Sequence, residues 1–232
     1  MRRPTLSIVV LLCALCVASD ASAHNVSETS AGYLAGLNEA AFPLFMYLGA
    51  KHMVTGVDHV LYLFAVVFLL YVPRDVLRLV TLFALGHSLT LISGMLFNWQ
   101  VNASAVDALI GLSIVYKGFE NLNGWRTLFG LTPPVGIAVF AFGLCHGLGL
   151  ATKLGAVYER GEGFVVNLIG FNVGVEVGQL IALMPLLLLL AWWRQRAGFA
   201  RYSGAVNTVL MGAGFAFAGY HALGAVLGPA VA

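Results

Sequence analysis

The sequence has few charged residues, because only 9% of its 232 residues are Asp, Glu, Lys or Arg. Soluble domains carry about 25%, so this deficit excludes an ordinary soluble protein. The formal net charge is +2 and no basic patch is present, so nucleic acid is not expected as a partner. With 60% hydrophobic residues and apolar runs of about 20 residues, the composition predicts an all-α integral membrane protein in contact with the lipid bilayer.

Cysteine is also scarce, with three in the chain. Two of them, Cys13 and Cys16, lie in a segment with the features of a secretory signal peptide, residues 1–23. Two arginines come first, an apolar core too short to span a bilayer follows, and Ala-Ser-Ala at 21–23 forms a cleavage site. Cleavage would make His24 the mature N-terminus and leave Cys145 as the single cysteine, so no intrachain disulfide is expected. An uncleaved first helix is the alternative.

Six apolar segments follow this leader. Residues 24–51 are expected to form an exported segment with a short interfacial or re-entrant helix, interrupted by Pro43, and residues 52–232 a polytopic helical domain in one bundle. Pro185 is a candidate kink in the fifth segment, which is long. The expected transmembrane helices lie at about 57–72, 76–97, 104–122, 133–152, 164–193 and 203–227.

Arginine positions predict the orientation of these spans. If the mature N-terminus is exported, the outer loops carry only Lys153 and Arg160, which Glu159 and Glu162 offset. Cytoplasmic loops carry an excess of Lys and Arg, so both mature termini are expected on the exported side. The inner loops would hold Arg74, Arg78, Arg126, Arg194, Arg196 and Arg201.

Glycines recur at four-residue intervals on two of the spans. Gly143 and Gly147 lie on the fourth, and Gly170, Gly174 and Gly178 lie on the fifth. Small residues at this spacing let helix backbones approach closely in lipid. The pattern predicts tight helix pairing and needs no function to explain it.

His52, Asp58 and His59 stand directly before the first apolar run. Ionisable groups are costly at membrane depth and usually mark a substrate or ion pathway. A continuous helix would place His52 and His59 on one face, whereas a break at Gly56 would let the backbone bend around an ion. Asp58 is either a further ligand or the group that fixes the tautomer of His59.

Other polar residues lie on the later spans. His146, Asp107 and His221 are expected to cluster with the first histidines in the outer half of the membrane, with His87 and Glu176 nearer its middle. Simpler explanations compete with this one: helix-to-helix hydrogen bonds for His87 and His221, and an N-cap for Asp107. The remaining candidates are the stripe Asn172, Glu176 and Gln179, taken as a cavity-lining face; Cys145, a packing residue or soft ligand; and Lys117 with Glu120, an i, i+3 pair.

Imidazole and carboxylate ligands together suit divalent transition metals. Nickel, cobalt, zinc and copper are the candidates, since magnesium or calcium would show more carboxylates. The same groups also suit a proton relay. No organic cofactor is expected.

The element from His52 to His59 resembles the His-x5-Asp-His signature of the HupE/UreJ family of hydrogenase and urease accessory membrane proteins. The stretches Phe-Ala-Leu-Gly-His-Ser-Leu-Thr-Leu at 83–91 and Phe-Gly-Leu-Cys-His-Gly-Leu-Gly at 142–149 are similar to that family as well. The resemblance implies a six-span permease of the bacterial inner membrane, with nickel or cobalt as substrate and a metalloenzyme maturation system as partner. It also implies metal handling by His52, Asp58, His59 and His146.

One motif departs from the family pattern. Nickel-handling members have Phe-His-Gly followed a few residues later by a glutamate, whereas here Cys145 replaces the Phe and residues 148–151 contain no acid. Glu176 is the candidate replacement for that carboxylate.

Two other functions fit the same residues. Three histidines and an aspartate can bind zinc and activate water, so an intramembrane zinc hydrolase is the alternative. The sequence shows no His-Glu-x-x-His motif and no evident general base, so an enzyme is not expected. A metal-binding accessory protein would bind the ion without transporting it.

Overall fold

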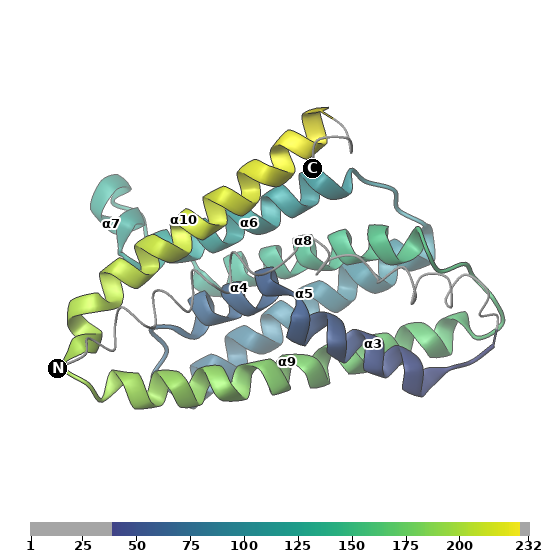
Figure 1. The fold of residues 1–232 in the computed structure, drawn as a ribbon, viewed down its shortest axis with the longest axis horizontal. Helices are drawn as coiled ribbons and strands as arrows, with labels where there is room; N and C mark the ends of the chain where they lie inside the picture. Colours follow the sequence, from purple (N-terminus) through teal and green to yellow (C-terminus); the bar gives the residue numbers. More distant parts are fainter. Residues whose placement is uncertain (1–38, 228–232) are drawn as a thin grey trace.

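The computed structural model describes residues 39–227, which contain helices and no strands. The predicted signal peptide and His24 lie outside the described residues. Successive long helices run in alternating directions along one elongated bundle (Figure 1). The helices are α3 (Phe42–Thr55), α4 (Val57–Val67), α5 (Pro73–Phe97), α6 (Ala103–Asn121), α7 (Gly124–Phe129), α8 (Val135–Gly155), α9 (Phe164–Arg194) and α10 (Gly198–Leu227).

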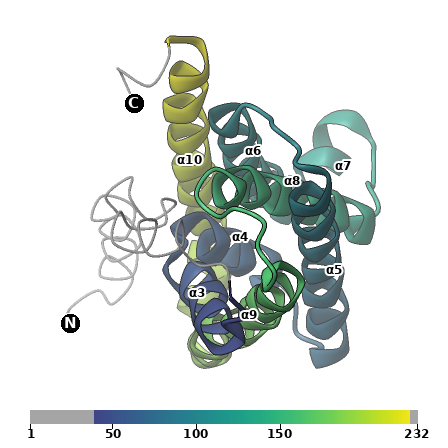
Figure 2. The same cartoon turned by 90° about the vertical axis from the view of Figure 1, so that its right-hand side faces the viewer.

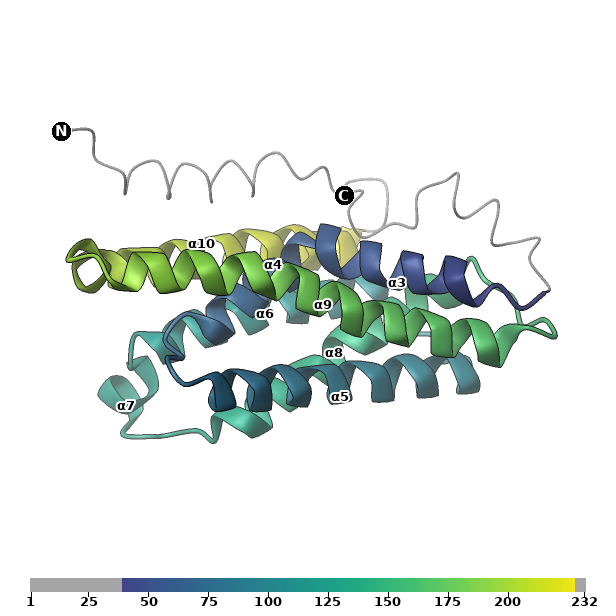
Figure 3. The same ribbon diagram turned by 90° about the horizontal axis from the view of Figure 1, so that it is seen from below.

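The bundle is built from three closely packed helix pairs, α3 with α9, α5 with α8, and α6 with α10. Figure 3 shows the α3–α9 pair on one side of the bundle and the α5–α8 pair on the other. Glycines lie at each contact: Gly174 meets the carbonyl of Met46, Gly147 meets that of His87, and Gly111 meets Ala218. The close packing predicted from the glycine spacing is therefore confirmed.

Helix α4 lies among the three pairs (Figure 2). Its apolar sequence suits this position, because every residue from Leu61 to Val67 is buried. The helix is short, so its last carbonyls need partners away from water. Arg194 supplies them by donating to the carbonyls of Val67 and Phe68 at 2.6 and 2.7 Å, and Asn121 donates to that of Ala65 at 2.9 Å.

The predicted spans agree with the helices in five cases and differ in the first. The span expected over 57–72 ends at Val67, so α4 is only about 16 Å long. Pro43 was expected to interrupt the short helix before the first span. It instead occupies the first turn of that helix, α3, where a missing N–H costs nothing. Pro185 lies inside α9 without ending it.

Four of the described helices are long and apolar enough to cross a membrane, namely α5, α8, α9 and α10. Helix α6 is not among them because it carries Asp107, Lys117 and Glu120. Lys117 and Glu120 form the predicted i, i+3 ion pair at 3.0 Å. The chain is a multi-pass membrane protein by these helices, and a total of six spans stays a prediction.

Candidate metal centre

The break between α3 and α4 brings two histidines together. Gly56 has extended backbone angles (φ −70°, ψ 101°), and its N–H donates to the carbonyl of His52 at 2.8 Å. In an unbroken helix seven residues would separate His52 and His59 by about 10.5 Å along the axis, whereas their ring centroids lie 4.9 Å apart. A Cβ at residue 56 would lie 2.8 Å from the carbonyl oxygen of His52 and 3.0 Å from Nδ1 of His59. Glycine is therefore required here, and of the two alternatives, a continuous helix or a break at Gly56, the structure has the break.

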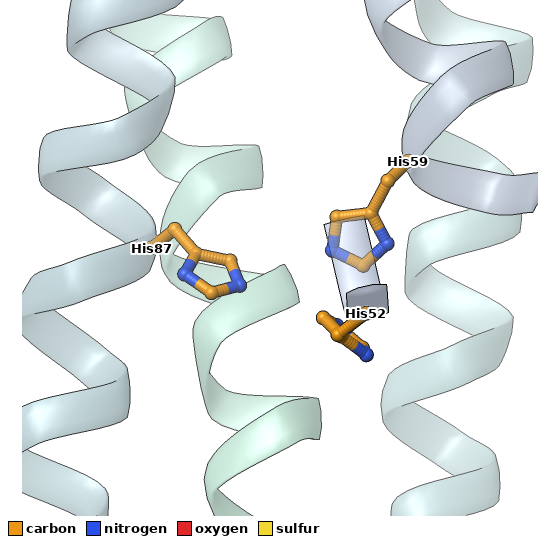
Figure 4. Close-up of side chains that lie close together, drawn as sticks. All are labelled: His52, His59 and His87. Atoms are coloured by element: carbon orange, nitrogen blue, oxygen red, sulfur yellow. The ribbon is translucent and has the colours of Figure 1, made fainter. Parts of the chain in front are cut away.

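His87 approaches these two rings from α5. Its ring centroid lies 5.8 Å from that of His59. Figure 4 shows the imidazoles of His52, His59 and His87 converging on one space. One ligand atom from each lies within 4.8 Å of the others. From the sequence, His87 was a candidate for the ion pathway below His52 and His59. In the structure it lies beside these two histidines.

His146 and Asp58 form a second group with His59. Their ligand atoms also lie within 4.8 Å of one another, and the rings of His59 and His146 are 4.7 Å apart. All three side chains are at most 2% exposed. We call His52, Asp58, His59, His87 and His146 the His/Asp cluster.

Hydrogen bonds set the tautomers of two of these histidines. Nδ1 of His59 lies 3.0 Å from a carboxylate oxygen of Asp58, and an ionised carboxylate only accepts, so the proton is on Nδ1 and the lone pair on Nε2. The hydroxyl of Ser113 donates to the carbonyl of Ile110 at 2.6 Å and lies 3.4 Å from Nε2 of His146. It can therefore accept from that nitrogen, which leaves the lone pair of His146 on Nδ1. In these tautomers Nε2 of His59 and Nδ1 of His146 are the ring nitrogens that carry a lone pair.

Aromatic rings enclose the cluster. Phe83 and Tyr62 lie 5.1 and 5.4 Å from the ring of His146, centroid to centroid, and Phe171 lies 6.3 Å from that of His52. These rings exclude water and strengthen every electrostatic interaction inside. A divalent ion offered three or four nitrogen and oxygen ligands here would be held in a dry, apolar surrounding.

Asp107 and His221 form a separate group. Both carboxylate oxygens of Asp107 accept from the ammonium of Lys153, at 2.8 and 2.7 Å, and Nδ1 of His221 lies 3.5 Å from Oδ2. Neither residue belongs to the groups of close metal-ligand atoms. Asp107 is not an N-cap either, because Asn102 caps α6 by accepting from the N–H of Ala105. Asp107 and His221 therefore lie outside the His/Asp cluster, and the common depth in the outer half of the membrane stays a prediction.

Lys153→Met is expected to lower the free energy of unfolding by about 3 kcal/mol, because it leaves the carboxylate of Asp107 buried without its ammonium partner. Thermal unfolding of the purified chain in detergent measures this. Lys51→Met, at an exposed lysine, is the matched control and should melt with the wild type. Equal melting of Lys153→Met and the wild type would contradict the assignment.

The polar stripe on α9 does not line the cluster as one face. Asn172 donates to its own helix at Leu168, and Gln179 donates to the carbonyl of Val80 at 3.1 Å. Glu176 is exposed, so it does not supply the carboxylate missing after His146. Cys145 is half-buried and belongs to neither group of close ligand atoms.

The sequence did not identify two residues that contact the site. Ser113 orients His146, and Tyr62 packs on the same ring. Tyr62 follows His59 by three residues and so shares its helix face, which was the available signal. Ser113 gives no such signal, because its role depends on the packing of α6 against α8.

The chain was compared with protein families, with curated proteins and with solved structures. A family model described as "HupE / UreJ protein" matches residues 28–227, most of the chain. No curated protein matches, and no solved structure matches.

Proposed function

This chain belongs to the HupE/UreJ family, which is linked to metal handling, and we propose that it is a membrane permease for a divalent transition metal ion, nickel or cobalt. The observation that supports transport most directly is the buried His/Asp cluster. Four imidazoles and a carboxylate meet there from α3, α4, α5 and α8. Burying so many ionisable groups is costly unless a cation compensates them.

The ion would enter from the exported side and leave toward the cytoplasm. The loops at 68–72, 122–134 and 195–197 share one end of the bundle, and they and the adjoining helix turns carry most of the arginines. The other end carries Glu159, Arg160 and Glu162. The excess of arginine favours the first end as cytoplasmic, which would place the described C-terminal end of α10 on the exported side, in the bacterial inner membrane.

Within the cluster the ligands would replace the water shell of the ion. Imidazole nitrogens suit nickel and cobalt, and the carboxylate of Asp58 lowers the net charge that the protein must bury. Three-ligand groups hold an ion less firmly than a closed four-ligand site. Moderate affinity is what transport needs, because a tightly held ion cannot leave.

Uptake of Ni²⁺ or Co²⁺ into proteoliposomes tests the proposal. The wild-type chain should raise the internal metal content above that of empty liposomes, measured by mass spectrometry after gel filtration. Asp58→Asn should lower the initial rate about tenfold or more, because the ion then keeps its full charge in a low dielectric. Asp75→Asn, at an exposed acid on α5, is the matched control. Equal uptake by Asp58→Asn and the wild type would contradict the role of the cluster, and binding without uptake would indicate an accessory protein.

A further inference from the structure

The His/Asp cluster contains two overlapping ligand groups. His52, His59 and His87 form one, and Asp58, His59 and His146 form the other, with the ligand atoms of each group within 4.8 Å of one another. We propose that these groups are two adjacent subsites for one divalent transition metal ion, which passes from one to the other while His59 stays coordinated. The inference rests on the proposed function and adds the route that the ion takes through the His/Asp cluster.

We call the group of His52, His59 and His87 the first subsite, and His87 completes it. Its side chain is 0% exposed, and neither ring nitrogen has a hydrogen-bond partner among the described residues. A buried polar atom without a partner destabilises the fold, the more so where lipid replaces water. A neutral imidazole offers its lone pair to a cation, and the ring of His87 faces that of His59 across the space seen in Figure 4. Metal binding therefore accounts for a side chain that packing alone does not.

The two subsites differ in charge. Three neutral imidazoles leave a bound dication with its full charge, whereas the carboxylate of Asp58 reduces the net charge to +1. In a low-dielectric interior the second arrangement is favoured. The ion therefore rests in the subsite of Asp58, His59 and His146, and the subsite of His52 and His87 is the weaker one.

His59 makes the transfer between subsites inexpensive. An ion stripped of all ligands in an apolar interior would face a large desolvation penalty. Because His59 belongs to both groups, bonds to His52 and His87 can break as bonds to Asp58 and His146 form, with one protein ligand kept throughout. The bond of its Nδ1 to Asp58 at 3.0 Å holds the ring in place during the exchange.

Co²⁺ is the probe, because its visible absorption reports its ligands. The purified full-length chain should bind one Co²⁺. His87→Gln should keep that affinity within about threefold, since the ion rests in the other subsite, but should lower Co²⁺ uptake into proteoliposomes at least tenfold. His146→Gln should lower affinity at least tenfold and change the Co²⁺ spectrum, because the ion then moves to the three-histidine subsite. His221→Gln, outside the cluster, is the control for binding.

Two results would overturn the inference. If His87→Gln transports Co²⁺ at the wild-type rate, there is no first subsite, although the proposed function stands. If His87→Gln loses binding as completely as His59→Gln, the cluster is one site. If the wild type neither binds nor transports Co²⁺ or Ni²⁺, the proposed function fails first, and the two failures are thus distinguishable.

A stability measurement separates a ligand from a structural histidine. His87→Leu removes the unpartnered ring nitrogens while keeping a side chain of similar size. We expect its metal-free melting temperature to equal or exceed that of the wild type, with uptake still lost. A clear fall in that temperature would show that His87 serves the fold and would overturn its assignment as a ligand.

Discussion

Replacing His59 with alanine is expected to abolish metal binding and metal uptake together. His59 is the one residue shared by both groups of close ligand atoms, so its loss leaves at most two ligands in either group. Its ring also lies within 6 Å of the rings of His52, His87 and His146, centroid to centroid. No other single substitution in the His/Asp cluster removes a ligand from both groups.

Thermal unfolding with and without Ni²⁺ measures the effect. A ligand at one hundred times its Kd stabilises a protein by about 2.7 kcal/mol, which for a chain of this size raises the melting temperature by roughly 5–10 °C. We expect that rise in the wild type and none in His59→Ala.

A matched control separates binding from folding. His221→Ala removes an imidazole outside the cluster, beside Asp107, and should keep the metal-dependent rise. The melting temperature of metal-free His59→Ala shows whether its bundle still folds. A rise with Ni²⁺ in folded His59→Ala equal to that of the wild type would show that the cluster is not the binding site.

Much of the fold follows from the sequence because lipid imposes a simple rule. A span must be helical, apolar and about 20 residues long, so five helices could be located to within a few residues. The exception is the segment after Gly56. Its run of apolar residues continues beyond Val67, but the helix ends there, and Arg194 donates to the carbonyls of Val67 and Phe68 that this end leaves without helical partners. That contact joins residues 126 and 127 positions apart, and no local pattern records it.

The candidate site was predictable where its ligands are close in the sequence and less so where they are not. His52, Asp58 and His59 are close in the sequence, and the family motif adds His146. The position of His87 depends on α5 meeting α8 through Gly143 and Gly147, and Gly147 touches the carbonyl of His87. The glycine spacing beside His146 predicted a close helix contact there, but not that α5 makes it.

Glu176 shows the opposite case. It lies about 200° around α9 from Gly174, and the side opposite the glycine ridge was interpreted as a cavity wall. The glycine ridge packs against α3, so this opposite position points away from that contact, and Glu176 is exposed. Helical spacing gives the angle between two side chains but not which of them faces the protein.

Gly174→Leu is expected to prevent correct folding of the bundle. A Cβ at residue 174 would collide with the backbone of Met46 on α3, and a backbone cannot move aside as a flexible side chain does. Overpacking of this kind costs about 3 kcal/mol or more. Because His52 lies in the last turn of α3, any separation of α3 from α9 would also displace a ligand of the His/Asp cluster. The purified variant should therefore melt well below the wild type and bind Ni²⁺ at least tenfold more weakly.

The chain provides a matched control for this glycine. Gly212 lies on α10 with no atom within 4 Å of the position that a Cβ would occupy, so Gly212→Leu makes the same chemical change without the collision. Both substitutions remove a helix-interior glycine, which by itself favours the helix by up to about 1 kcal/mol. We expect Gly212→Leu to fold, melt and bind Ni²⁺ like the wild type. If the two leucine variants behave alike, the α3–α9 contact does not determine the position of His52, and the close packing of that pair is not what builds the metal centre.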